Sequence, residues 1–270
     1  MRRGTGKSRG KAKMGLGRKI ILVICLIVFL GSAGVLLDYF INGAREQGAL
    51  EDLKGLQTER EDLVTDKGTV IGKYADLYLA NDDIIGWVTI EDTNIDYPVM
   101  QTQDDPEFYL HRGFDKEYAA SGVPFMDAVS DIFVPTSNFL IYGHNMKNGT
   151  MFHDLLEYED KAFYEQHPTF KFDTIYKGGQ GTYQVIAAGY TQIYPQDSKK
   201  FKYYQYAGMT TETEFYEYLR GVREISSYDT GVSAEYGDQL ITLSTCAYHV
   251  EDGRFIVVAK RTDAKQRVPQ

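Results

Sequence analysis

Cysteine is scarce in this sequence, with two residues among 270. So few cysteines exclude a disulfide-stapled scaffold and a cysteine-rich zinc module. The five histidines show neither a His-x-x-x-His spacing nor a grouping with carboxylates, so we expect no metal ion and no other cofactor. Internal repeats are also absent. A hydrophobic content of 43% and an aromatic content of 13% exclude a disordered chain.

Basic residues are unevenly distributed along the chain. Residues 1–19 hold eight Lys and Arg and no acidic residue, a charge of +8. The other 251 residues carry 21 basic and 38 acidic side chains, a charge of −17. A basic tail can bind nucleic acid or an acidic surface, so the segment that follows it decides between the two.

An uncharged apolar segment follows the tail. Residues 20–37 contain no charge over 18 positions, and a helix of that length spans about 27 Å, close to the hydrocarbon thickness of a bilayer. Tyr39 and Phe40 suit the membrane interface. We therefore expect a basic cytoplasmic tail at residues 1–19, a transmembrane signal-anchor in the lipid bilayer at residues 20–41, and no nucleic-acid partner.

The excess of Lys and Arg before the anchor also predicts the topology. It places the N-terminus in the cytoplasm and residues 42–270 outside, in a single-pass protein of the cell membrane. Two alternatives are a cleaved signal peptide, which the small residues 31–33 would allow, and a buried core helix. With the anchor in place, Cys246 is the only exterior cysteine and has no intrachain partner.

The exterior part divides into a short helical region and a larger domain. Residues 42–80 indicate a helical stalk over 43–68 and then a helix with a 3.6-residue apolar stripe. Residues 81–263 predict a mainly β domain, a barrel or a sandwich, and residues 264–270 a C-terminal tail. The strand-like runs are 84–90, 94–100, 122–126, 138–142, 182–194, 239–245 and 255–259. Two helices are expected among them, at 151–166 and 212–225.

Three side chains with reactive chemistry lie at predicted strand ends. Cys246 ends the run ITLSTC, Arg254 precedes the run FIVVA, and His144 follows the run NFLIYG. If the first two runs are adjacent antiparallel strands, Arg254 can approach the sulfur across the sheet. A rigid sheet can then hold all three groups at one rim.

These residue types together suit acyl transfer. A thiolate is a nucleophile, a histidine can take its proton and protonate a leaving amine, and an arginine offers a permanent charge and a planar fork of donors to an oxyanion. Alternatives stay open for each. Cys246 can be an inert buried thiol or an intermolecular link, His144 can be structural, and His249 is a rival base.

The same segments resemble those of a known family. Residues 242–246, TLSTC, resemble the TLxTC signature of the sortases, which are membrane-anchored cysteine transpeptidases of Gram-positive bacteria. The sequence YGH at 142–144, with Met-Phe at 151–152, resembles the segment around the sortase histidine. Arg254 with FIVVAKR resembles the strand of the sortase arginine, and GWVTI with TNIDYPVMQ resembles the start of the domain. The resemblance covers about residues 80–261.

Within the family the chain is similar to class B. Ser244 stands in the variable position of the signature, the predicted helix 212–225 precedes the cysteine strand, and helices precede residue 80, as in class B sortases. The resemblance implies a closed eight-stranded sortase-type β-barrel, with N-terminal helices and a helix before the cysteine strand. It also implies an extracellular catalytic domain on a membrane anchor.

The resemblance further implies the reaction and the partners. Cys246 would attack the Thr carbonyl of an NPxTx sorting signal on a surface protein, with His144 as acid and base and Arg254 as oxyanion and substrate clamp. An amine of the peptidoglycan cross-bridge, or a pilin lysine, would release the acyl group. Implied substrate-binding positions are Tyr142, Ser244 and, by approximate alignment, Leu110.

Two further features bear on the assignment. The loop around Tyr203 and Tyr204 is a candidate cover for the substrate or a simple surface packing element. Ala247 and Tyr248 follow the cysteine where some class B members carry acidic residues, which puts in doubt any role for a carboxylate there. A papain-like protease is disfavoured because its cysteine precedes its histidine, and a non-catalytic membrane-tethered scaffold is the remaining rival.

Overall fold

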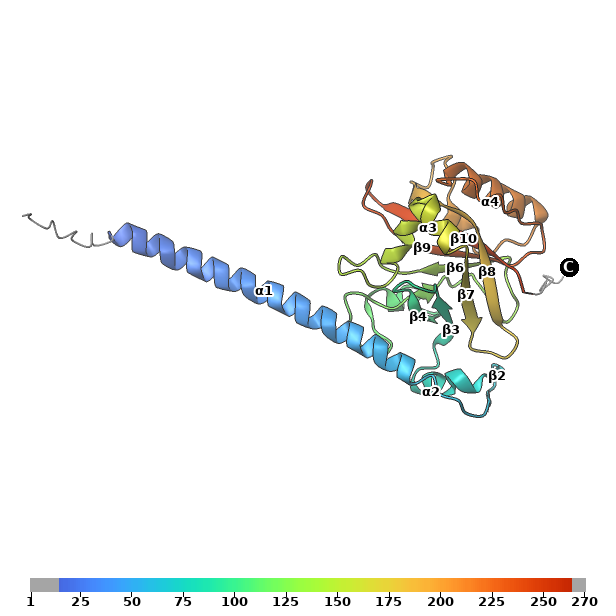
Figure 1. Ribbon diagram of the computed structural model, residues 1–270, viewed down its shortest axis with the longest axis horizontal. Helices are drawn as coiled ribbons and strands as arrows, with labels where there is room; N and C mark the ends of the chain where they lie inside the picture. Colours follow the sequence, from blue (N-terminus) through green and yellow to red (C-terminus); the bar gives the residue numbers. More distant parts are fainter. Residues whose placement is uncertain (1–14, 264–270) are drawn as a thin grey trace, which may run out of the picture. The chain divides into compact units, whose positions relative to one another are not determined.

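The computed structural model describes residues 15–263 (Figure 1). By the contacts among its residues the chain forms two compact units, residues 1–45 and residues 46–270. Of the sequence-based expectations, the basic tail lies mostly outside the described residues, and the C-terminal tail 264–270 lies wholly outside them.

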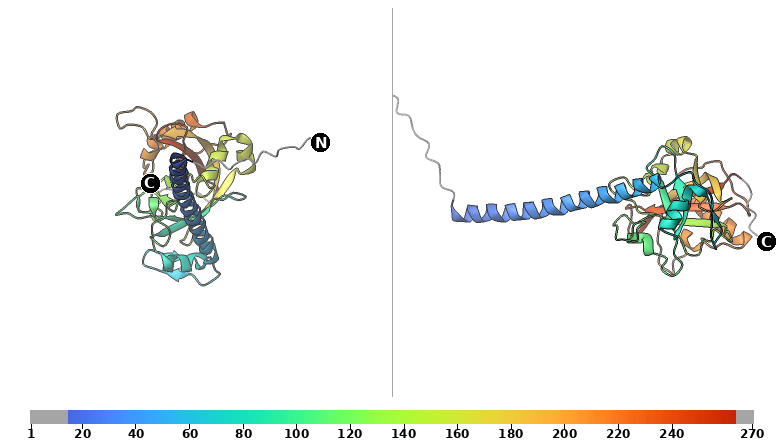
Figure 2. Two further views of the ribbon diagram at one scale, coloured as in Figure 1. Left: turned by 90° about the vertical axis from the view of Figure 1, so that its left-hand side faces the viewer. Right: turned by 90° about the horizontal axis from the view of Figure 1, so that it is seen from below.

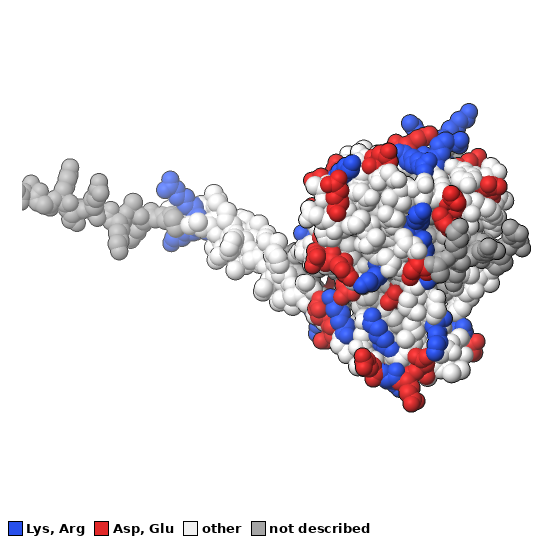
Figure 3. Space-filling view, turned by 45° about the vertical axis from the view of Figure 1, so that its right-hand side comes forward, with Lys and Arg blue, Asp and Glu red and all other residues white. Residues whose placement is uncertain are grey.

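Helix α1 (Leu16–Gly55) runs without interruption through the expected anchor (Figures 1 and 2). Its most apolar stretch is long enough to cross a membrane and has no part buried inside the protein, which argues against a buried core helix. Length and composition of this kind also fit a signal sequence. In Figure 3 the charged residues near the start of α1 are followed by an uncharged surface, as a membrane segment requires.

The expected stalk helix is correct only in part. The last turns of α1 belong to the second unit, where Leu50 and Leu53 are buried in its core. The helix ends at Gly55, so the expectation of a helix through residue 68 is wrong beyond that point. A two-stranded ribbon, β1 (Leu63–Val64) and β2 (Thr69–Val70), follows instead, because Gly68 with φ +143° closes a turn that a helix cannot contain. Helix α2 (Gly72–Ala80) follows.

Eight strands close into a barrel, as expected (Figure 1), and their order is β10-β8-β7-β3-β4-β5-β6-β9. They are β3 (Ile84–Thr89), β4 (Asp96–Met100), β5 (Phe125–Met126), β6 (Asn138–Tyr142), β7 (Thr169–Thr174), β8 (Gln180–Gln192), β9 (Leu240–Cys246) and β10 (Gly253–Arg261). Most neighbours are antiparallel, but β6 pairs with β9 in parallel, as does β4 with β5.

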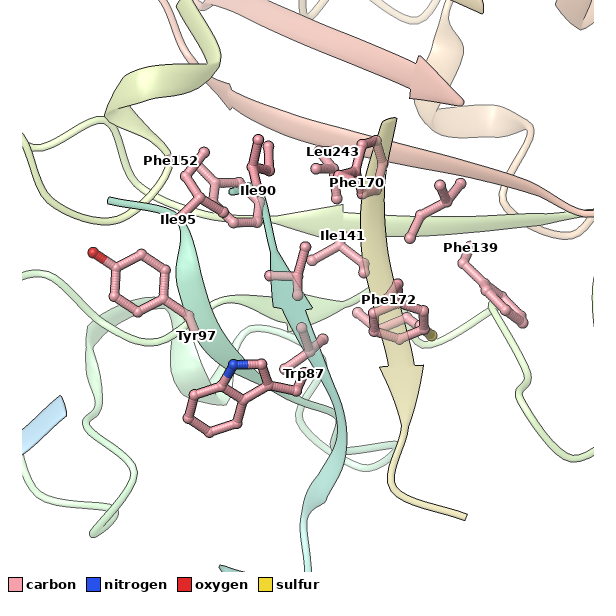
Figure 4. Close-up of a cluster of buried hydrophobic side chains, with 14 of the residues drawn as sticks. Trp87, Ile90, Ile95, Tyr97, Phe139, Ile141, Phe152, Phe170, Phe172 and Leu243 are labelled. Atoms are coloured by element: carbon pink, nitrogen blue, oxygen red, sulfur yellow. The ribbon is translucent and has the colours of Figure 1, made fainter. Parts of the chain in front are cut away.

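The alternation of side chains along the strands creates two apolar layers. One fills the barrel, with Phe139, Ile141 and Leu243 among its members (Figure 4). The other lies outside the barrel, where Leu140 and Ile256 face helix α4 (Glu212–Ile225). Strand residues two apart share a face, so Tyr142 of β6, Ser244 and Cys246 of β9, and Arg254 of β10 lie on the same outer face as this layer.

Helix α4 is the helix expected before the cysteine strand. It starts with a capping box, in which Thr211 accepts from the backbone of Glu214 and the Glu214 carboxylate accepts from the backbone of Thr211. Its apolar stripe, including Phe215 and Tyr218, is buried against the barrel. Without this cover the outer layer of β9 and β10 would be exposed to water.

Two other expectations need correction. The helix expected over residues 151–166 is split into a 3₁₀ helix η2 (His153–Glu159) and α3 (Lys161–Gln166), because Asp160 adopts an extended backbone and caps α3 through Ala162 N. The strand expected from residue 122 begins only at Phe125, since Gly122 has φ +55°. Strand β7 was not predicted, although Phe170 and Phe172 alternate in it and point into the core. Short 3₁₀ turns η1 (Phe108–His111) and η3 (Tyr203–Gln205) complete the domain.

Candidate active site

Cys246 is the last residue of β9 and lies directly opposite Arg254, the second residue of β10. The expectation that these two runs are adjacent antiparallel strands is therefore confirmed. The hairpin between them is closed by a hydrogen bond from Ala247 N to Gly253 O of 2.9 Å. Gly253 is needed there, since a Cβ would lie 2.1 Å from the Ala247 carbonyl oxygen. The tight hairpin thus fixes which residue opposes the cysteine.

His144 comes next to Cys246 through the parallel pairing of β6 with β9. Tyr142 pairs with Ser244, and Gly143 N donates to Ser244 O at 3.0 Å, so the chain continues alongside the end of the cysteine strand. Gly143 packs on the ring of Phe152, where a Cβ would lie 2.7 Å from the ring carbons. A larger residue would push the histidine segment away from β9.

The surroundings of His144 favour its neutral form. Burial lowers the pKa of His144, and the nearby positive charges of His111 and Arg254 act in the same direction, against a hydrogen bond with Leu110 O that raises it. That bond, 2.8 Å from Nε2, requires a hydrogen on Nε2, because a carbonyl oxygen only accepts. Nδ1 of the neutral ring is then left as the proton acceptor. The His111 ring stacks on His144 with centroids 5.3 Å apart.

Arg254 keeps most of its donors available. Within the described part of the chain, the hydrogen bond that its guanidinium makes is from Nη1 to Gly253 O, at 2.9 Å. The side chain is half-buried, and no acidic side chain of that part forms an ion pair with it. A guanidinium in this state can offer its fork to an incoming oxygen.

A groove of about 580 Å³ joins these groups. All six residues expected from the sequence line it, namely Cys246, His144, Arg254, Ser244, Tyr142 and Leu110. Its other walls are Pro106, Glu107, Phe125, Asp127, Ala128, Val129, Gly143, Ile193, Tyr204 and Thr245. Among residues 15–263, no three His, Cys, Asp or Glu side chains are arranged to hold a metal ion. The groove is mostly apolar, with Cys246, His144 and Arg254 together in its wall.

Ser244 has a partner within the protein. Its Oγ lies 2.7 Å from the hydroxyl of Tyr203, and both residues are buried. Burial raises the pKa of Tyr203 to about 12, so the phenol stays protonated. Tyr204, the next residue, lines the groove. The segment that was a candidate cover for substrate is thus fastened to the cysteine strand and forms a wall.

Tyr142 is bonded to a residue that the sequence did not single out. Its hydroxyl donates to Asp127 Oδ2 at 3.0 Å, and Asp127 Oδ1 accepts from Val129 N at 2.9 Å. Burial and the Asp127 charge raise the pKa of Tyr142 and keep it neutral. Asp127, Val129 and Ile193 belong to irregular segments or lie just past a strand, and no motif marks them. Their place in the groove follows from the tertiary fold alone.

The rival base His249 lies elsewhere. Its ring packs on Tyr190, with centroids 4.6 Å apart, its side chain is exposed, and it is absent from the groove lining. A position three residues after the cysteine does not bring it to the same rim, because the hairpin loop carries it to the other side of β10.

Comparisons with known proteins agree with this geometry. A family model described as a sortase domain matches residues 88–262. Sortase B of Listeria monocytogenes is 36% identical over 253 residues, which cover 93% of this chain and 98% of that protein. Sortase B of Staphylococcus aureus is 28% identical over 244 residues, covering 90% of this chain and 94% of the relative.

Solved structures give the same result. Sortase B from Bacillus anthracis in complex with AAEK1 superimposes with a TM-score of 0.69 at 27% identity, covering 83% of this chain and all of that one. A Staphylococcus aureus sortase B–substrate complex gives a TM-score of 0.68 at 26% identity, covering 83% and 99%.

Proposed function

This chain belongs to the sortase family as a class B member, a cysteine transpeptidase, and we propose that Cys246 is its nucleophile, His144 its acid and base, and Arg254 its oxyanion and substrate clamp. The observation that carries the proposal is their meeting in one groove, at the ends of β6, β9 and near the start of β10. Each residue type is what acyl transfer through a thiol requires.

In the first half-reaction the Cys246 thiolate adds to the carbonyl carbon of Thr in the sorting signal. The C–N bond then breaks, the acyl group stays on sulfur as a thioester, and the leaving amine takes a proton from His144. In the second half-reaction an amine adds to the thioester and gives a proton to His144. The C–S bond breaks, which forms the new amide and restores the thiolate.

The active protonation state needs the thiolate and the imidazolium together. Because burial and the adjacent cations lower the pKa of His144, the imidazolium is the minor form of this side chain in the resting protein. The active form is then a minority population of a coupled pair. Arg254 favours the thiolate by its charge, and the donors of its guanidinium that Gly253 leaves unused can stabilise the tetrahedral oxyanion.

The substrate would be an NPxTx sorting signal on a surface protein. Support comes from class B membership and from a groove that Tyr142, Leu110 and Ser244 line together with the nucleophile. The acceptor would be an amine of the peptidoglycan cross-bridge. A pilin lysine is the alternative acceptor, since the same thioester chemistry serves either amine.

We further propose the arrangement of the chain around the membrane. Residues 1–19 would be cytoplasmic, residues 20–41 would span the bilayer once, and the catalytic domain 81–263 would act outside the cell, joined by residues 42–80. The uncharged surface of α1 behind a basic start supports this arrangement. The test is a C-terminal fusion to a reporter that works only in the cytoplasm. Activity of that reporter would contradict this arrangement.

The test uses the full chain in detergent with fluorogenic NPxTx and LPxTG peptides and triglycine as the amine. We expect Cys246-dependent cleavage, preference for NPxTx, and a new peptide–triglycine product. Cleavage of neither peptide by the wild-type chain would favour the non-catalytic scaffold. A thiol reagent that fails to label Cys246 in the folded protein would favour an inert thiol.

A further inference from the structure

His144 is held between two hydrogen bonds that join its segment to the cysteine strand. On one side, Thr245 Oγ1 donates to Gly143 O at 2.8 Å. On the other side, Asn145 Nδ2 donates to the carbonyl oxygen of Cys246 at 3.0 Å. The two bonds run in opposite directions and include the neighbours of His144 on both sides. The Asn145 bond reaches the backbone of the cysteine itself.

The orientation of the Asn145 amide is determined by its partners. The Cys246 carbonyl can only accept, so the amide nitrogen faces it and the amide oxygen faces away. That oxygen lies 2.8 Å from His153 Nδ1, which must therefore carry a hydrogen and donate. Asn145 is buried, with 8% of its surface exposed, and both ends of its amide are bonded. The amide is thus fixed from two sides.

Backbone contacts hold the same loop in place around this amide. Asn145 and Met151 form an isolated antiparallel bridge, and Phe152 N donates to His144 O at 2.8 Å. The loop is therefore closed on itself without the Asn145 side chain. What the side chain adds is a connection between Cys246 O and His153 Nδ1.

We propose that Asn145 is a positioning residue, which sets the distance and direction between His144 and Cys246. It is absent from the groove lining and acts through these two groups, not on the substrate. The inference rests on the proposed roles of Cys246 and His144. Because proton transfer needs a base within hydrogen-bond reach of the thiol, loss of this connection lowers the chemical rate and not substrate binding.

The first experiment compares Asn145→Ala with Asn148→Ala in the full chain in detergent. Asn148 lies in the same loop but bonds only locally, its Oδ1 accepting from Thr150 N and Thr150 Oγ1. We expect Asn145→Ala to lower kcat by about 10- to 100-fold with little change in KM. Asn148→Ala should keep kcat within about twofold of wild type, even if its Tm falls as much as that of Asn145→Ala. Equal losses of kcat in both variants would show a loop-stability effect and overturn the proposal.

The second experiment uses Asn145→Asp, which keeps the size and still accepts from His153. At neutral pH the ionised carboxylate cannot donate to the Cys246 carbonyl, so kcat should fall as in Asn145→Ala. Position 145 is buried, and burial raises the pKa of a carboxyl group above its usual value, so acidification protonates Asp at this position and restores a donor. The ratio of variant to wild-type kcat should therefore rise several-fold from about pH 7.5 to about pH 5. A ratio independent of pH would contradict the positioning role, and this variant gives an answer even if Asn145→Ala does not fold.

The outcome for Cys246→Ala separates this inference from the proposed function. If Cys246→Ala is inactive while Asn145→Ala and Asn145→Asp have normal kcat, only the positioning role fails. If Cys246→Ala retains the wild-type rate, the proposed nucleophile fails, and the positioning role fails with it.

Discussion

Cys246 and Arg254 face each other directly across the β9–β10 pair. Opposed residues of antiparallel strands point to the same face with Cβ atoms about 4.5–5.5 Å apart. The next residue, Phe255, points into the barrel core. A slip of one residue would exchange the two faces of β10 and send Arg254 into the barrel. The register of one hairpin therefore decides whether the guanidinium and the sulfur share a groove.

Replacing Arg254 with Lys keeps the charge and removes the planar fork. We expect kcat/KM to fall by about 10²- to 10³-fold, because a single ammonium cannot hold an oxyanion with two parallel donors. Peptide cleavage kinetics give the measurement, and Arg220→Lys on the exposed face of α4 is the control. A near-normal rate for Arg254→Lys would mean that this residue acts through charge alone.

His144 should titrate below the usual histidine value of 6.5, because its burial disfavours the imidazolium. NMR of the ring C–H signals, assigned by loss in His144→Gln, measures this directly. Since the charge of His111 also lowers the pKa of His144, His111→Gln should raise it. A pKa for His144 at or above 6.5 in the resting protein would contradict the role given to burial.

The lowered pKa of His144 also makes the stability of the fold depend on pH. Its folded-state pKa lies below the unfolded value, so protonation favours the unfolded chain. The contribution to stability is present above about pH 6.5 and is lost as the pH falls through the folded pKa. We expect His144→Gln to lose less stability than wild type over this acidic range, measured as Tm against pH.

Tyr203→Phe tests whether the groove wall is fastened through Ser244. Removal of the hydroxyl leaves Ser244 Oγ buried without its partner, which should cost about 1–3 kcal/mol. Because Tyr204 lines the groove, KM should rise several-fold as well.

Tyr218→Phe is the matched control for that variant. The Tyr218 hydroxyl is hydrogen-bonded to Thr242, which lies on β9 two residues before Ser244. Tyr218 does not line the groove. Thr242 also donates to Asn138 Oδ1 at 2.9 Å, so it keeps a partner. We expect a lower Tm with unchanged KM. A rise in KM of equal size in both variants would show that general loosening, not the Ser244 bond, controls the wall.

Gly143→Ala should damage both the fold and the reaction. The new Cβ would meet the Phe152 ring at 2.7 Å, and Phe152 is completely buried. Overpacking of this kind costs about 1–3 kcal/mol, and the displaced segment carries His144. Gly48→Ala is the control, since nothing lies within 4 Å of its added Cβ. Tm and kcat are measured for both, and unchanged kcat for Gly143→Ala would contradict the tight fit.

Strand pattern made much of this site predictable. The alternating runs before Cys246 and His144 and after Arg254 indicated strand ends, and the outer face that they share follows from the period of two. Strand β7 carries a similar pattern through Phe170 and Phe172 but was not predicted, because Lys171 and Asp173 on its other face are charged. The break at Asp160 could have been suspected, since an Asp favours a helix start.

Other features depend on contacts that the sequence does not encode locally. The bond between Asn145 and Cys246 joins positions 101 residues apart and exists only because β6 and β9 pair in parallel. Asp127 and Ile193 come directly after β5 and β8, and nothing in the pattern of those strands shows that their ends meet at the groove. The partner of the Ser244 hydroxyl, Tyr203, is likewise set by how the chain between β8 and α4 folds over the outer face.

The most direct test of the proposed nucleophile is to trap the thioester. The full chain in detergent is incubated with an NPxTx peptide without an amine, quenched, digested and analysed by mass spectrometry. We expect an acyl fragment ending in Thr on the peptide that contains Cys246, released by hydroxylamine and missing in Cys246→Ala. Peptide cleavage by Cys246→Ala at the wild-type rate, with no adduct on Cys246 in the wild type, would contradict the assignment.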